Sequence, residues 1–74
     1  MSAQKLVRMA NEIARNMRTL PDDQPAIATA NHLKSFWTPS MCASLLAHLD
    51  AGGDGLDPIA REAAVLLRSP PAKS

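Results

Sequence analysis

The residues that most constrain the fold lie in one short stretch, where one predicted helix ends and another begins within four residues. Phe36 and Trp37 stand side by side there, and they are the only phenylalanine and the only tryptophan in the chain. Pro39 disfavours the α conformation at Thr38, so a helix that arrives from the N-terminal side should end near Trp37. Thr38 can then cap a new helix that has Pro39 at its first position. The two largest apolar side chains are therefore predicted at a corner between two helices.

The first half of the chain predicts two helices. From about residue 3 to residue 18, all apolar side chains project onto one half of a helix and all polar ones onto the other half, which has a clear excess of basic residues. A second helix is expected to follow a cap at Asp22 or Asp23, to carry Pro25 in its first turn, and to end near Trp37. Its alanine-rich apolar side should let another helix approach closely.

The second half predicts two more helices and completes a small all-α bundle with tight proline and glycine turns. The third helix should run from Thr38 and Pro39 to about Ala51, where the GGDG run of residues 52–55 ends it. Asp57 and Pro58 then cap and start the fourth helix. Residues 1–68 should form one domain with antiparallel neighbours, followed by a flexible tail over residues 69–74. The apolar stripe expected on the fourth helix is Ile59, Ala63, Leu66 and Leu67.

Length and composition predict that the isolated chain has only marginal stability. Its 74 residues make one small domain, and such a domain buries only about 60–65% of the surface that its unfolded chain exposes. The single cysteine, Cys42, excludes an internal disulfide, and together with His32 and His48 it has no metal-ligand spacing. Oligomerisation or docking on a larger protein is the expected source of the missing stability.

Charge and hydropathy argue against nucleic acid and membranes as partners. The net charge is only +1, whereas phosphate binding normally needs a clear basic excess. No apolar run is long enough to span a bilayer, and the N-terminal residues lack the apolar stretch of a secretory signal. A single thiol suits a reducing compartment, so we expect a cytoplasmic protein.

No group of residues has the pattern of a catalytic or cofactor-binding site. Cys42 lies on the apolar stripe of the third helix, where burial should raise the pKa of the thiol and make it inert. Neither His32 nor His48 has a carboxylate at helical spacing that would make it a general base. The GGDG run lacks the preceding strand and the GK[ST] ending of a phosphate loop, and it lacks the oxygen ligands of a calcium loop. We therefore predict no catalytic, cofactor-binding or metal-binding residue, and no enzyme activity of the chain by itself.

One surface is predicted to meet a partner protein. Phe36 and Trp37 point about 100° apart on a helix, so one ring can serve the core while the other faces outward. The residues alone leave open whether Trp37 fills the core or anchors an interface. The basic half of the first helix can be a solvated face with Arg8–Glu12 and Glu12–Arg15 ion pairs, or a docking face for an acidic partner. The predicted interface consists of Phe36, Trp37, Pro39, Met41, Lys5, Arg8 and Arg15.

Two other classes of protein remain open from the residues alone. One class is a free-standing homo-oligomeric helix bundle, in which contacts between copies of the chain would supply the missing stability. A helix-turn-helix nucleic-acid binder could be built around the turn at Trp37 and Pro39. Against that class, the following helix has no lysine or arginine between Ser40 and Ala51 to contact phosphates or guanine.

Four short segments carry a pattern that extends over nearly the whole chain, from about Lys5 to Leu67. They are residues 6–14 (LVRMANEIA), the pairs His32-Leu33 and Phe36-Trp37 with Pro39 and Met41, residues 45–49 (LLAHL), and residues 52–58 (GGDGLDP). Each segment is short, but their order and spacing together are specific. In this arrangement they resemble the delta subunit of NAD-dependent formate dehydrogenase.

The resemblance implies a small accessory subunit of a cytoplasmic complex. In that family the larger subunits oxidise formate with a molybdenum or tungsten bis-molybdopterin guanine dinucleotide (bis-MGD) site, iron–sulfur clusters and flavin mononucleotide (FMN), and pass the electrons to NAD. The delta subunit carries no redox centre and is associated with assembly, loading of the molybdenum cofactor and stability of the complex. The resemblance thus implies larger formate dehydrogenase subunits as partners, first of all the catalytic alpha subunit, and it carries over no catalytic residues.

Overall fold

Four helices make up the part of the chain that the structure, a computed structural model, describes: residues 2–19 and 24–68. In chain order they are α1 (Ala3–Thr19), α2 (Pro25–Phe36), α3 (Pro39–Asp50) and α4 (Pro58–Arg68). No strand occurs within these residues, and the predicted all-α fold class is confirmed. Gln24, and not the predicted Asp22 or Asp23, is at the N-cap position of α2, with Pro25 as the first helical residue as expected for the first turn. Asp22, Asp23 and the predicted tail over residues 69–74 lie outside the described residues.

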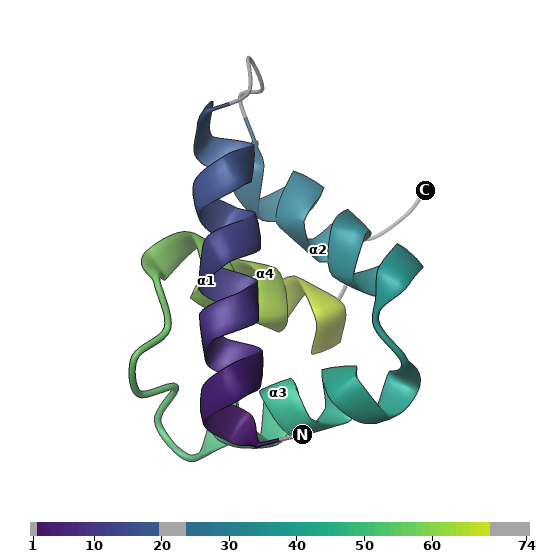
Figure 1. The fold of residues 1–74 in the computed structure, drawn as a ribbon, viewed down its shortest axis with the longest axis vertical. Coiled ribbons are helices and arrows are strands. Elements are labelled where there is room, and N and C mark those ends of the chain that lie inside the picture. Colours follow the sequence, from purple (N-terminus) through teal and green to yellow (C-terminus); the bar gives the residue numbers. More distant parts are fainter. Residues whose placement is uncertain (1, 20–23, 69–74) are drawn as a thin grey trace.

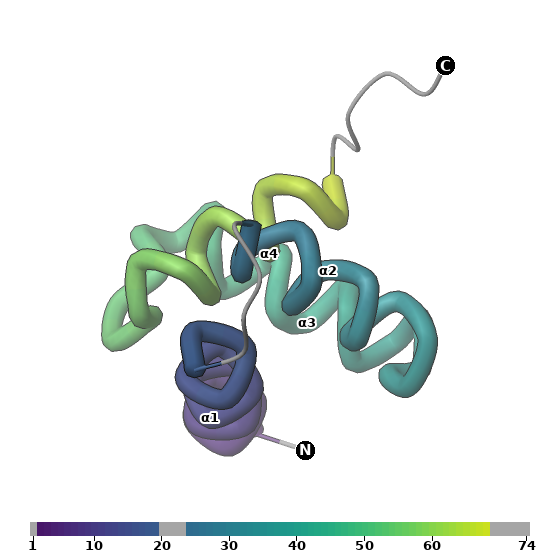
Figure 2. The backbone as a smooth tube through the Cα atoms, turned by 90° about the horizontal axis from the view of Figure 1, so that it is seen from above, coloured from purple at the N-terminus to yellow at the C-terminus, as the bar shows by residue number. Residues whose placement is uncertain are grey.

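The first helix lies across the other three. Figure 1 shows α1 upright, with α3 crossing near its N-terminal end. Figure 2 looks along the axis of α1 and shows α2, α3 and α4 running back and forth across the view. The chain reverses direction from α2 to α3 and again from α3 to α4, so α2 and α4 run in the same sense. The antiparallel packing expected from the short connections therefore does not describe α2 and α4, the pair that packs most closely. Within residues 2–19 and 24–68, no helix combines the length and the apolar character needed to cross a bilayer.

Two helices begin as their cap–proline pairs predict. The Thr38 hydroxyl accepts a hydrogen bond from the backbone N–H of Met41 at 3.1 Å, at the start of α3. The Asp57 carboxylate accepts one from the backbone N–H of Ile59 at 2.9 Å, at the start of α4. In both helices proline follows the cap directly, at a position where no N–H is needed.

Replacing Thr38 with alanine is expected to lower the free energy of unfolding by about 1 kcal/mol. The Met41 N–H would lose its acceptor, while Pro39 would still favour the first helical turn. Urea unfolding followed by circular dichroism measures the change. Thr38→Ser keeps the hydroxyl and should retain most of the stability, and an unchanged midpoint for Thr38→Ala would show that this cap adds nothing.

The core is built from leucine and from many alanine side chains. Leu6, Leu33 and Leu45 are completely or almost completely buried, and they belong to one cluster to which α1, α2, α3 and α4 all contribute. The most closely packed pair of helices is α2 and α4. Both bury mainly small side chains, which lets two backbones approach closely. These buried residues are Ala26, Thr29 and Ala30 on α2, and Ala60, Ala63 and Ala64 on α4.

The buried face of α4 differs in part from the predicted stripe. Ala63 is buried as expected, but its predicted companions Ile59, Leu66 and Leu67 are only half-buried. The positions that are completely buried beside Ala63 are other alanines of the same helix. Because α4 packs so closely against its neighbours, only small side chains fit at the centre of the contact, and the larger ones lie along its flanks.

Candidate docking surface

The corner between α2 and α3 turns its two aromatic rings in different directions. Helix α2 ends at Phe36. The next residue, Trp37, has an extended backbone conformation (φ −89°, ψ 147°), and its N–H donates to the Leu33 carbonyl at 2.9 Å. Trp37 is 8% exposed and belongs to the core cluster, whereas Phe36 is 73% exposed. The structure thus assigns the two rings: Trp37 packs inside the chain and Phe36 faces outward.

The Phe36 ring is accompanied by a second ring on its side of α2. Its centroid lies 4.6 Å from that of the half-buried His32, one helical turn earlier, with 37° between the ring planes. Two other large hydrophobic residues are exposed in the described part of the chain, Ile27 at 36% and Val65 at 47%, and both are more covered than Phe36. Large aromatic side chains are enriched where protein partners bury surface.

The other apolar residues of the predicted interface lie in the first turn of α3. Pro39 is exposed, and Met41 is half-buried and packs against the core cluster. The unbranched thioether of methionine adapts to irregular surfaces. The corner therefore brings together Phe36, Pro39 and Met41 as accessible residues, while Trp37 contributes to the surface only through the fold that it supports.

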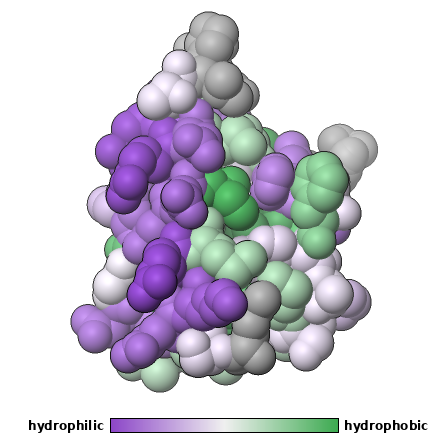
Figure 3. Space-filling view, viewed as in Figure 1, coloured by the Kyte–Doolittle hydropathy of each residue, from purple (hydrophilic) through white to green (hydrophobic). Residues whose placement is uncertain are grey.

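The basic residues of the predicted interface lie on the outer face of α1. Lys5, Arg8 and Arg15 are all exposed, while the opposite face of the helix is buried. On the face of the molecule drawn in Figure 3, hydrophilic side chains gather over α1 and apolar ones lie beside it, towards α2 and α3. A basic strip therefore borders a partly apolar surface.

The ion pairs predicted within α1 do not form. Glu12 has no salt bridge with Arg8 or Arg15, because both salt bridges among residues 2–19 and 24–68 involve other residues. An exposed pair on one helix is worth only a few tenths of a kcal/mol and must hold two long side chains in one geometry. The basic side chains of the outer face thus have no ion-pair partner in the described part of the chain.

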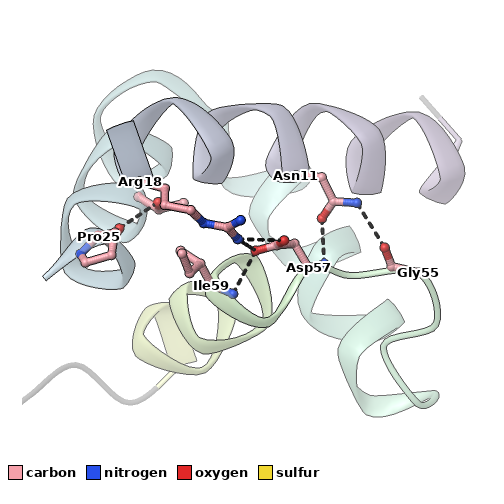
Figure 4. A network of polar contacts seen from close by, with 7 residues as sticks. Asn11, Arg18, Pro25, Gly55, Asp57 and Ile59 are labelled. Carbon is pink, nitrogen blue, oxygen red and sulfur yellow. Dashed lines mark hydrogen bonds and ion pairs between the residues drawn. The ribbon is translucent and has the colours of Figure 1, made fainter. Parts of the chain in front are cut away.

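A polar network on the flank of α1 holds the turn that precedes α4 (Figure 4). The Asn11 side chain donates to the Gly55 carbonyl at 2.9 Å and accepts from the Asp57 N–H at 2.8 Å. One terminal nitrogen of Arg18 lies 2.9 and 3.0 Å from the two carboxylate oxygens of Asp57. The carboxylate that caps α4 is therefore also held by α1.

Two further side chains hold the same turn from α3 and α4. The Nε2 atom of His48 is 2.7 Å from the Asp54 carbonyl oxygen, and Arg61 donates to the carbonyls of Gly52 and Gly53 at 3.3 and 3.0 Å. Gly53 has φ +63°, and a Cβ atom there would lie 2.8 Å from the Arg61 guanidinium. The GGDG run is thus a fixed turn, as well as the end of α3 that the sequence predicted.

Sequence reasoning missed the roles of Asn11, Arg18, His48 and Arg61. It placed Asn11 and Arg18 only on the polar half of the first helix, and for His48 it only excluded roles as a general base and as a metal ligand. One signal was present: residues 6–14 and 52–58 both carry the family pattern, and the network joins these two segments.

Replacing Asn11 with alanine is expected to lower the free energy of unfolding by about 1–2 kcal/mol, because two hydrogen bonds to the turn are lost at once. Asn16→Ala is the matched control, because Asn16 is exposed on the same helix and its side chain makes no hydrogen bond within the described residues; its backbone carbonyl, which accepts from the Thr19 hydroxyl, is kept. Chemical unfolding of both variants measures the difference. Equal stability of the two variants would contradict a stabilising role for the Asn11 contacts.

The described residues bring no reactive groups together. No three or more histidine, cysteine, aspartate or glutamate residues among them lie close enough to hold a metal ion. Cys42 is half-buried, and burial raises the pKa of its thiol above the ordinary value. A raised pKa lowers the fraction of thiolate, the nucleophilic form, at neutral pH. The accessible features of the described residues include an aromatic corner and a basic helix face.

These features define a small protein of four helices with one exposed aromatic ring and a basic helix face. A family model described as NADH-dependent formate dehydrogenase delta subunit FdsD matches residues 5–64. Because this match covers most of the chain, the protein belongs to the family of delta subunits of NADH-dependent formate dehydrogenase. The resemblance seen in the sequence is confirmed. A search of curated proteins and a search of solved structures each gave no significant match.

Proposed function

We propose that this chain is a non-catalytic accessory subunit that supports assembly of the formate dehydrogenase complex, loading of its molybdenum cofactor and stability of the assembled enzyme. Membership of the delta subunit family supports a place beside the other subunits of the complex. The observation that carries the accessory role is the 73% exposure of Phe36 at a corner whose neighbouring tryptophan is buried. An exposed aromatic ring that the core does not need can anchor a partner protein. It supplies no acid, base, nucleophile or metal ligand for a reaction.

The proposed binding partner is the catalytic alpha subunit. In this arrangement Phe36, Pro39 and Met41 contact the partner directly, Trp37 holds the corner in shape, and the basic face of α1 steers the approach. The bis-MGD site with molybdenum or tungsten, the iron–sulfur clusters, FMN and NAD would all be bound by the larger subunits, and the assembled enzyme would work in the cytoplasm.

Metal analysis of the complex made with and without this chain tests the proposal. Without the chain, the molybdenum or tungsten content per alpha subunit and the formate-dependent reduction of NAD should fall severalfold together, while iron and FMN change less. Supplying the chain during expression should restore both. Full metal content and unchanged thermal stability in its absence would contradict the proposal, and so would formate oxidation by the purified chain alone.

A further inference from the structure

We infer that the partner surface that receives this chain is acidic and surrounds an apolar pocket, with carboxylates opposite Lys5, Arg8 and Arg15 and the pocket filled by the Phe36 ring. The inference rests on the proposed function and adds the chemistry of the partner. It commits to a face of a larger formate dehydrogenase subunit, not to a second copy of this chain.

The charge of α1 is the first observation that points to an acidic partner. Its outer face carries Lys5, Arg8 and Arg15 against the single carboxylate of Glu12, and all four side chains are exposed. Intramolecular salt bridges do not neutralise this face, because those of the described residues lie elsewhere. Charges that are exposed and close together act over about one Debye length, roughly 8–10 Å at physiological salt. A carboxylate-rich surface is the complement of such a strip.

Two other arginines differ from those of the α1 strip because they form salt bridges within the chain. Arg18 is paired with Asp57, and Arg68 with Asp50 and the Leu46 carbonyl. These two arginines fasten helices to each other, so their charge is already matched inside the chain. Three of the exposed cations of the described residues that have no salt bridge there lie on α1. The other two are Lys34 of α2 and Arg61 of α4, and Arg61 is bonded to the carbonyls of Gly52 and Gly53.

The backbone around Phe36 is the second observation, and it points to a pocket. Phe36 is the last residue of α2, so the backbone before it is helical. After it, the Trp37 N–H donates to the Leu33 carbonyl, and the Thr38 hydroxyl caps α3 by accepting from the Met41 N–H. Trp37 itself is fixed in the core. The exposed ring is therefore presented by a backbone that is ordered on both sides, and pre-organisation of this kind lowers the cost of binding. Anchors that fill a desolvated pocket commonly dominate the energy of an interface.

The two parts of the surface should affect binding differently. Exposed charges at the rim of an interface act mainly on the association rate and make it depend on salt. A buried anchor acts mainly on the lifetime of the complex. Salt dependence of the association rate therefore reports on the acidic character of the partner, separately from whether docking occurs.

Association kinetics at low and high salt test the inference. The full chain is mixed with the larger formate dehydrogenase subunits purified together from cells that lack it. At low salt, Arg8→Glu and Arg15→Glu should each slow association by about three- to tenfold, and at high salt the difference from the unchanged chain should nearly vanish. Lys34→Glu is the matched control, because it makes the same change in net charge. Residues two positions apart on a helix do not share a face, so Lys34 lies away from Phe36 and should change the rate by less than about twofold.

The outcomes separate the inference from the proposed function. If the unchanged chain binds, but at a rate that salt does not alter and that Arg8→Glu, Arg15→Glu and Lys34→Glu affect equally, the partner surface is not acidic and the accessory role stands. If the unchanged chain does not bind the larger subunits at any salt concentration, both are overturned. Slower binding by the two α1 variants alone, with helical content unchanged by circular dichroism, supports the inference.

Discussion

Replacing Trp37 with alanine is expected to abolish the folded state of the isolated chain. Removal of a buried tryptophan side chain typically costs about 3–5 kcal/mol, and a domain of this length rarely gains more than about 3–5 kcal/mol from its core. Trp37 is 8% exposed and belongs to the core cluster, so most of that cost should apply. Far-UV circular dichroism with thermal unfolding measures the result. Co-purification with the larger subunits should fall as well, because the docking corner would no longer form.

The neighbouring ring supplies the control for this experiment. Phe36→Ala removes an aromatic side chain one residue away, but that side chain is 73% exposed. Its loss should change the free energy of unfolding by no more than about 0.5 kcal/mol. A wild-type melting temperature for Trp37→Ala, or unfolding caused by Phe36→Ala, would contradict the assignment of the two rings.

The same Phe36→Ala variant is expected to weaken binding to the larger subunits by about 30-fold, which corresponds to about 2 kcal/mol. The physical reason is the loss of an exposed aromatic anchor from an otherwise intact fold. The rate of dissociation should carry most of the effect. Equilibrium binding and dissociation kinetics with the purified larger subunits measure both quantities.

A second exposed apolar residue allows a matched comparison for binding. Val65 of α4 is 47% exposed, and Val65→Ala also shortens a hydrophobic surface side chain. This variant should bind with nearly unchanged affinity, because it lies on a helix outside the proposed interface. Equal affinity of Phe36→Ala and the unchanged chain would place the interface elsewhere on the molecule.

Local rules were enough to predict where α3 and α4 begin and where α3 ends. Thr38-Pro39 and Asp57-Pro58 start α3 and α4 with the hydrogen bonds that such pairs favour. Glycine after α3 supplies the positive φ angles that end a helix, at Gly52 and Gly53. These features depend on a few neighbouring residues, so one sequence is enough to show them. The alanine-rich side of α2 likewise indicated close packing, and α2 packs most closely with α4.

The arrangement of α1 and its polar contacts could not be predicted in the same way. Asn11 bonds to Gly55 and Asp57, which lie 44 and 46 residues further along the chain. A polar side chain on an amphipathic helix can equally face water, and nothing in the local sequence states which alternative holds. The directions of Phe36 and Trp37 also depended on the extended backbone at Trp37, which a helical projection does not contain.

The contacts of Asn11 and Arg18 imply that the chain folds cooperatively. Both side chains belong to the first helix, yet the residue that they hold, Asp57, starts the last one. An N-terminal fragment without residue 57 would lack these bonds, and a C-terminal fragment would lack the groups that fix its cap. Bringing Asn11 to Asp57 closes the chain between them, which costs conformational entropy. That cost is offset only when all four helices pack together. We therefore expect neither half of the chain to be structured by itself.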